Sequence, residues 1–166
     1  MFNDSSPEKV KSKTYLLNSN EVCKSIFLIQ KGTAWKFYLK DRTKIATEFV
    51  FAEDIILSHS SYLLQIPSKE YIQVLEDSLV YRIEFGKFEN MIQKYPILNE
   101  LDKLILEYNS LKLEDRLNHL LFKTPKEKLE WLLSREPKVL EKIPKKYLAS
   151  YLGVTLETIS RLKKFD

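Results

Sequence analysis

The chain has 166 residues, of which 44% are hydrophobic and 30% charged, and its formal net charge is +4. This length and balance allow one large or two small globular domains and exclude a disordered or fibrous protein. The longest apolar runs, such as residues 26–29, are far shorter than the roughly 20 residues of a membrane-spanning helix. The polar N-terminal segment does not resemble a secretory signal, so we expect a cytoplasmic protein with no membrane partner.

Cysteine and histidine are too scarce for the common metal sites. Cys23 is the only cysteine, which excludes intrachain disulfides, cysteine-ligated zinc and four-cysteine iron–sulfur clusters. His59 and His119 lie far apart, and the serines beside His59 indicate a polar loop and not a catalytic pair. There is also no glycine-rich phosphate loop. We therefore expect no metal, no cofactor, no catalytic residue and no enzymatic activity.

The positive charge is concentrated near the C-terminus. Residues 123–166 contain 11 Lys/Arg and 6 Asp/Glu, a net charge of +5, which leaves −1 for all preceding residues. A basic terminal segment on a nearly neutral body is typical of proteins that bind nucleic acid, although many solvated surfaces are also basic.

Residues 14–85 alternate between apolar and polar with a period of two, as half-buried strands do. Residues 34–40 and 45–51 show this alternation on either side of an Asp41-Arg42 turn, which predicts a hairpin. Further strands are expected at residues 25–30, 70–76 and 79–85. Several short strands with polar turns predict an antiparallel sandwich or roll.

The period changes to that of a helix after Phe85. A short helix is expected around residues 88–92, and Pro96 stands where a second, long helix can begin. Apolar residues then recur at alternating steps of four and three, a spacing that forms a narrow seam. The seam consists of Ile97, Leu101, Leu104, Tyr108 and Leu111, and a second row of Leu113, Leu117, Leu120 and Leu121 follows. The helix either lies on its own sheet or pairs with a second copy, and we favour the homodimer because the seam is too long for a small roll to cover.

The last quarter of the chain contains the pattern that predicts function. Thr124, Pro125 and Glu127 form a helix-start signal with a capping box. Residues 145–164 then match a helix-turn-helix, with small Ala149 at the close contact, Gly153 in the turn and apolar residues at the core positions. The core positions are Leu148, Leu152, Val154, Ile159 and Leu162. An ordinary helical hairpin is the alternative, but the agreement of every position and the basic charge favour DNA binding.

The second helix of this motif would present polar and basic groups to the major groove of DNA. Arg161 can donate two hydrogen bonds to guanine, Glu157 can accept one from cytosine, and Ser160 can reach a base or a phosphate. Thr155 caps the helix, and Leu156 either meets a thymine methyl group or faces solvent. Four lysines are placed for phosphates: Lys145, Lys146, Lys163 and Lys164.

Residues 143–161, IPKKYLASYLGVTLETISR, resemble the C-terminal DNA-reading motif of the Crp/Fnr family of bacterial transcription regulators, particularly its short members from Bacteroidetes. Residues 22–32 and 67–77 are similar to strands of that family's cyclic-nucleotide-binding β-roll. The resemblance therefore covers nearly the whole chain, and it places the base-reading residues of the family on Glu157 and Arg161.

The resemblance implies an α+β fold in three parts. These are a jelly-roll-like antiparallel β-roll over residues 1–95, a long dimerisation helix over 96–122 and a helix-turn-helix domain over 123–166. The chain ends at Lys164-Phe165-Asp166, so we expect no phosphate contacts from a wing after the motif.

The β-roll departs from the pattern of cyclic-nucleotide receptors. Those receptors hold the ribose and phosphate with a Gly-Glu pair and an arginine, where this chain has Ala52-Glu53-Asp54 and Pro67-Ser68-Lys69. The Glu53 and Asp54 carboxylates would repel a phosphate. An effector pocket would involve Glu53, Ser68 and Lys69, and it would hold a ligand other than cyclic AMP, or none.

Together these features predict a homodimeric, sequence-specific transcription regulator that does not respond to cyclic AMP. Its partners would be double-stranded DNA, a second copy of the chain and RNA polymerase. The alternative is a ligand-sensing β-roll protein whose DNA binding is weak or lost.

Overall fold

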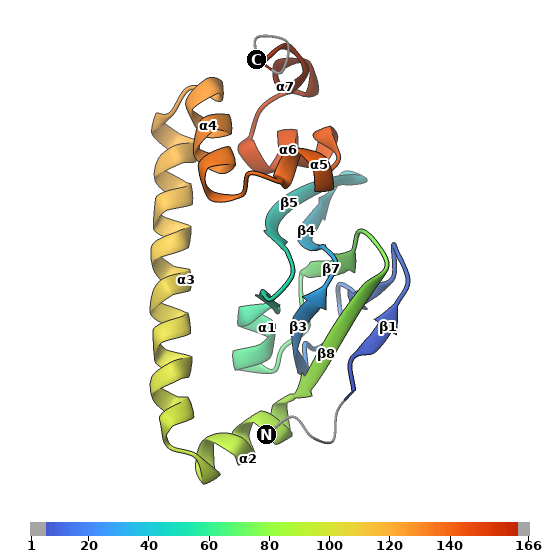
Figure 1. Ribbon diagram of the computed structural model, residues 1–166, viewed down its shortest axis with the longest axis vertical. Helices are drawn as coiled ribbons and strands as arrows, with labels where there is room; N and C mark the ends of the chain where they lie inside the picture. The colour runs from blue at the N-terminus through green and yellow to red at the C-terminus, as the bar shows by residue number, and fades with distance from the viewer. Residues whose placement is uncertain (1–5, 163–166) are drawn as a thin grey trace. The chain divides into compact units, whose positions relative to one another are not determined.

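The computed structural model describes residues 6–162, with every side chain in that range except those of residues 101 and 102 (Figure 1). The chain divides into two compact units, and the boundary lies between Phe88 and Glu89. The strands are β1 (Glu8–Val10), β2 (Tyr15–Leu17), β3 (Ser25–Lys31), β4 (Ala34–Lys40), β5 (Thr43–Val50), β6 (Ile55–Ile56), β7 (Glu70–Val74) and β8 (Ser78–Glu84). The helices are α1 (His59–Leu64), α2 (Phe85–Lys94), α3 (Ile97–Phe122), α4 (Pro125–Arg135), α5 (Val139–Lys142), α6 (Lys145–Leu152) and α7 (Leu156–Leu162).

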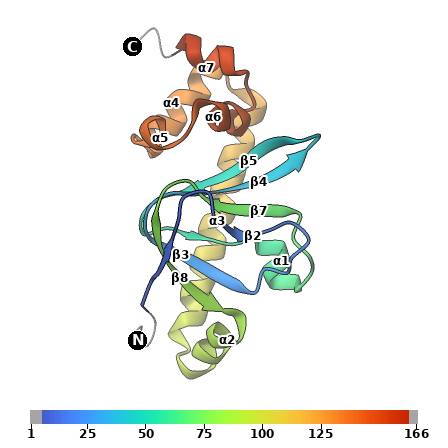
Figure 2. The same cartoon turned by 90° about the vertical axis from the view of Figure 1, so that its right-hand side faces the viewer.

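Two four-stranded sheets form the first unit, and every strand pair is antiparallel. The strand orders are β1-β8-β3-β6 and β2-β7-β4-β5. Figure 2 shows the second of these sheets, in which β4 lies between β5 and β7. Fully buried apolar side chains from both sheets, among them Phe27, Ile56, Ile72 and Val80, form the core. The predicted α+β class with an antiparallel roll is confirmed.

The predicted hairpin is present as β4 and β5. Two residues are enough to join these strands because of the backbone conformation of the turn. Asp41 and Arg42 both adopt left-handed backbone angles, with φ values of 48° and 65°, as a tight two-residue hairpin turn requires. The strands pair from Lys40 opposite Thr43 to Ala34 opposite Val50.

The simple alternation predicted for β4 is wrong at two positions. Lys36 is buried, whereas Leu39 is 49% exposed. The reason is that the first half of β4 is covered on both faces: Ala34 packs in the core, and the Trp35 and Phe37 rings stack on each other 4.2 Å apart. Leu39 lies beside the turn, beyond this cover.

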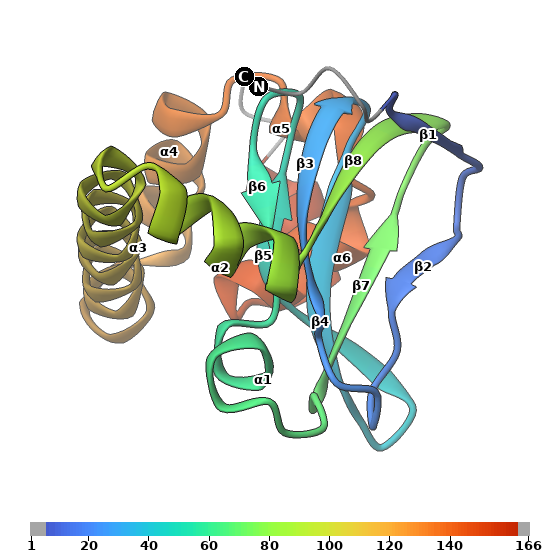
Figure 3. The ribbon, with the colours of Figure 1, turned by 90° about the horizontal axis from the view of Figure 1, so that it is seen from below.

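The shortest strands and helices were not predicted from the sequence. Strands β1, β2 and β6 have only two or three residues, and helices α1 and α5 have six and four. Segments of this length contain too few residues to display a period, so only their tertiary pairing identifies them. Figure 3 shows β8 between β1 and β3, with α2 directly following β8.

The long helix begins where it was predicted, whereas α2 is longer than the helix expected around residues 88–92 and includes Phe85, which was expected in a strand. Phe85 and Phe88 of α2 pack against the core of the first unit, and α3 begins directly after Pro96. Helix α3 has 26 residues, which corresponds to about 39 Å at 1.5 Å per residue. The capping box of α4 is complete, since the Thr124 hydroxyl accepts from the Glu127 N–H and the Glu127 carboxylate accepts from the Thr124 N–H.

Candidate nucleic-acid interface

Helices α6 and α7 form the helix-turn-helix predicted from the sequence, and Gly153 makes the turn between them. Its φ of +65° lies in the left-handed region, where a residue with a side chain is strained. The Gly153 N–H donates to the carbonyls of Ala149 and Ser150, and the Val154 N–H donates to Ala149 at 3.0 Å. These bonds satisfy the last carbonyls of α6 and redirect the chain into α7.

The two helices share a small apolar core. Leu148, Leu152 and Ile159 are buried, and so is the small side chain of Ala149. Val154 and Leu162 are half-buried at its edge. Six of the seven predicted positions therefore pack at this core, and the seventh, Gly153, makes the turn.

Thr155 caps α7, as expected. Its hydroxyl oxygen accepts from the Thr158 N–H at 3.2 Å and lies 3.0 Å from the Thr158 hydroxyl. The pKa of Glu157 is lowered mainly by a hydrogen bond from its own backbone N–H to the carboxylate, and secondly by one from the Thr155 hydroxyl. Glu157 is therefore ionised at neutral pH and can accept a hydrogen bond from an exocyclic amino group.

The outer side of α7 carries the predicted base-reading residues. Thr155, Leu156, Glu157 and Arg161 are exposed, and Ser160 is half-buried. Lys145 and Lys146 are exposed in the first turn of α6. Lys163 and Lys164 lie outside the described residues. The arrangement places one acceptor and one bidentate donor on consecutive turns of one short helix.

The predicted seam lies on exposed positions of α3. Leu104 and Tyr108 are each 61% exposed, and Ile97 and Leu111 are similarly exposed, while the side chain of Leu101 lies outside the described residues. Leu113, Leu117 and Leu121 of the second row are also exposed, together with Leu106. Leu120 is half-buried, and its side chain lies near Gly153 of the helix-turn-helix.

The three residues expected in an effector pocket, Glu53, Ser68 and Lys69, differ in their exposure to solvent. Glu53 and Lys69 are exposed, whereas Ser68 is buried. Glu53 belongs to a turn after β5, in which its N–H donates to Ile29 at 2.7 Å. The Ser68 hydroxyl contacts the Ser58 hydroxyl and the Glu70 backbone.

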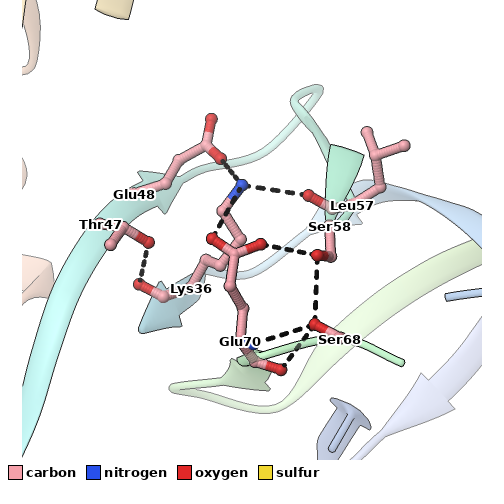
Figure 4. Close-up of polar contacts among 7 residues, drawn as sticks. All are labelled: Lys36, Thr47, Glu48, Leu57, Ser58, Ser68 and Glu70. Carbon is pink, nitrogen blue, oxygen red and sulfur yellow. Dashed lines mark hydrogen bonds and ion pairs between the residues drawn. The ribbon is translucent and has the colours of Figure 1, made fainter. Parts of the chain in front are cut away.

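A buried polar cluster that the sequence analysis missed lies inside the roll (Figure 4). The Lys36 ammonium lies 3.0 Å from Glu48 and 3.9 Å from Glu70, and it donates to the Leu57 carbonyl at 3.1 Å. The Ser58 hydroxyl donates to the Glu70 carboxylate at 2.7 Å. Residues from β4, β5, β7 and the segment before α1 thus form one network, which we call the Lys36 cluster. The strand pattern could have indicated this cluster. Successive side chains of a strand point to opposite faces, so Lys36, between Trp35 and Phe37, must lie on the same face as Ala34.

The cluster influences the titratable groups around it. Burial is the main cause that raises the pKa of the Cys23 thiol, while backbone N–H groups and the Lys36 charge oppose this effect. Burial also raises the pKa of Tyr38, and the negative charge of Glu70 adds to the increase. Both groups are therefore neutral at physiological pH.

Removal of the Lys36 ammonium should destabilise the first unit. In Lys36→Met the Glu70 and Glu48 carboxylates keep their burial and lose their counter-charge, so we expect a loss of about 3 kcal/mol in the free energy of unfolding. Urea denaturation measures this difference. Lys40→Met on the same strand is the matched control, since Lys40 is exposed, and equal stabilities of the two variants would contradict the structural role of the cluster.

Among residues 6–162, no group of three His, Cys, Asp or Glu side chains is placed to hold a metal ion. No helix within that range is long and apolar enough to cross a membrane.

Comparison with solved structures identifies the fold of this chain. No family profile and no curated protein matches the sequence. Among solved structures, FixK2 from Bradyrhizobium japonicum matches 97% of this chain and 84% of its own, with a TM-score of 0.83 and 14% identity. A protein from Eubacterium rectale assigned to the Crp/Fnr family of transcriptional regulators matches 99% of this chain and 79% of its own, with a TM-score of 0.71 and 22% identity. The c-di-GMP-responsive regulator CLP from Xanthomonas campestris matches 96% and 86%, with a TM-score of 0.71 and 12% identity. From its roll to its helix-turn-helix, the chain has the fold of the Crp/Fnr transcription regulators.

Proposed function

We propose that this protein is a sequence-specific DNA-binding regulator of transcription that acts as a homodimer. The observation that carries the proposal is the α6–α7 unit, which exposes Glu157 and Arg161 on the outer side of a capped helix. Proteins described as transcriptional regulators share the fold, which supports the same role here.

Each polar group of α7 has a defined role in this proposal. Arg161 donates to guanine, Glu157 accepts from cytosine, and Ser160 contacts a base or a phosphate. Leu156, which is 45% exposed at the start of α7, packs on a thymine methyl group, and Thr155 holds the helix start in place. Four lysines neutralise phosphates and add affinity without sequence preference: Lys145, Lys146, Lys163 and Lys164.

The homodimer forms through α3. Leu104, Tyr108 and their seam neighbours offer apolar side chains to a second copy of the helix, and burial of such side chains drives helix pairing. Two copies of α7 then address two half-sites about 34 Å apart, which is one turn of DNA. The dimer acts on transcription through RNA polymerase at the promoters that it binds.

The regulator works without cyclic AMP. The only lysine that the described structure places inside the roll, Lys36, is already engaged by two carboxylates and a carbonyl. An anionic nucleotide would have to displace these partners and lie beside the negative charges of Glu48 and Glu70, which is electrostatically unfavourable. Titration calorimetry with cyclic AMP should therefore detect no binding.

Selection of DNA from a randomised duplex pool tests the proposal. The purified protein, without added effector and at near-physiological salt, should enrich a two-fold-symmetric motif containing guanine–cytosine pairs in each half-site. Failure to enrich any motif, also with metabolite extract present, would contradict DNA reading and favour a ligand-sensing roll that has lost it. Light scattering at micromolar concentration should show a dimer.

A further inference from the structure

One face of the last turns of α3 is attached to the DNA-reading helices. Asp115 and His119 are four residues apart, as are Arg116 and Leu120, so the four side chains form two adjacent rows on one side of the helix. Each of the four contacts α4, α6 or the turn after α6. The C-terminal end of α3, the helix with the predicted dimer seam, is therefore in direct contact with helices α4 to α7, which we call the reading unit.

The contact with α6 is made by Arg116. Its guanidinium donates to the Tyr151 carbonyl at 3.2 Å and lies 4.2 Å from the centre of the Tyr151 ring. Tyr151 is in the last turn of α6, two residues before Gly153. Carbonyls at the end of a helix lack partners within the helix, and a cation there is favourable. Arg116 thus binds the end of α6 at the point where the chain turns toward α7.

A second group of contacts holds α4 on the same helix. The Asp115 carboxylate accepts from the Trp131 indole at 3.0 Å and forms an ion pair with Arg135. The His119 ring stacks on Trp131 with their centres 4.4 Å apart. This group fixes the helix before the helix-turn-helix, whereas Arg116 is a polar contact that joins α3 to α6 itself.

We infer that Arg116 is a positioning residue that sets the separation of the two recognition helices, and so the half-site spacing that the dimer accepts. The inference rests on the proposed function. A change of one base pair in spacing moves a half-site by about 3.4 Å along the DNA and rotates it around the axis. A rigidly held reading unit tolerates only one spacing, whereas a loosely held unit adapts to several. Arg116 does not need to touch DNA to have this effect.

The inference is tested with duplexes that carry two copies of the selected half-site at different spacings. Wild-type protein should prefer one spacing. In Arg116→Met, which keeps the aliphatic stem but loses the hydrogen bond and the charge, that preference should fall about tenfold because neighbouring spacings become accessible. The base preferences within each half-site and the dimeric state should not change. Lys103→Met is the matched control, since Lys103 is an exposed cation of α3 whose ion-pair partner is Glu107, within the same helix.

The outcomes separate this inference from the proposed function. An unchanged spacing profile for Arg116→Met, with an unchanged half-site motif, overturns the role of Arg116 and leaves DNA reading intact. Absence of any half-site motif in the wild-type protein overturns both. If Arg116→Met does not fold by circular dichroism, Tyr151→Leu removes the ring under the guanidinium, and it should broaden the spacing profile in the same direction.

Discussion

Replacing Arg161 with alanine should abolish most of the sequence preference of the protein. Arg161 is exposed on α7 and has no role in the apolar core of the motif, so its loss leaves the fold and the dimer intact. A bidentate arginine–guanine contact contributes about 1–3 kcal/mol of discrimination. We therefore expect the preference for guanine to fall about 10- to 100-fold in each half-site, as measured by competition between the selected duplex and single-base variants.

Lys145→Ala is the matched control for this prediction. Lys145 is exposed at the start of α6, where it is placed for a phosphate. Its removal should weaken binding to all sequences equally and reduce the slope of log affinity against log salt by about one per contact. An unchanged binding motif in Arg161→Ala would show that another residue reads the DNA and would contradict the assignment of α7.

The double substitution Leu104→Glu with Tyr108→Glu should convert the dimer into a monomer. Both side chains lie on the exposed seam of α3, and four glutamates facing one another across a helix pair would repel. A monomer binds one half-site instead of two, so operator affinity should fall at least about 100-fold. Light scattering at micromolar concentration and a gel-shift titration measure the two effects.

The opposite face of α3 supplies the control. Leu113 and Leu117 are also exposed, and Leu113 lies nine residues after Leu104, about two and a half turns, so the two stripes face opposite directions. Leu113→Glu with Leu117→Glu should remain dimeric. The opposite result, a monomer for this variant and a dimer for Leu104→Glu with Tyr108→Glu, would contradict the assignment of the seam. It would show that the dimer forms through the face with Leu113 and Leu117.

Much of the fold and of the DNA-reading motif follows from neighbouring residues in the chain. The capping box of Thr124 and Glu127 links residues three apart, and the turn at Gly153 depends on the left-handed angles of one glycine. The hairpin of β4 and β5 follows from alternation on either side of two turn residues. In each case the interaction that determines the structure joins residues close together in the chain, so it can be predicted from the sequence.

The sequence by itself therefore determined the antiparallel roll, the long helix and the helix-turn-helix with Glu157 and Arg161 on its exposed side. Only the tertiary structure decided which distant polar groups meet. Lys36, Glu48 and Glu70 come from three different strands, and strand order and register bring them together. The contact between Arg116 and Tyr151, 35 residues apart, likewise depends on how the helices pack. Local patterns specify elements and their faces, whereas long-range packing determines which side chains become partners.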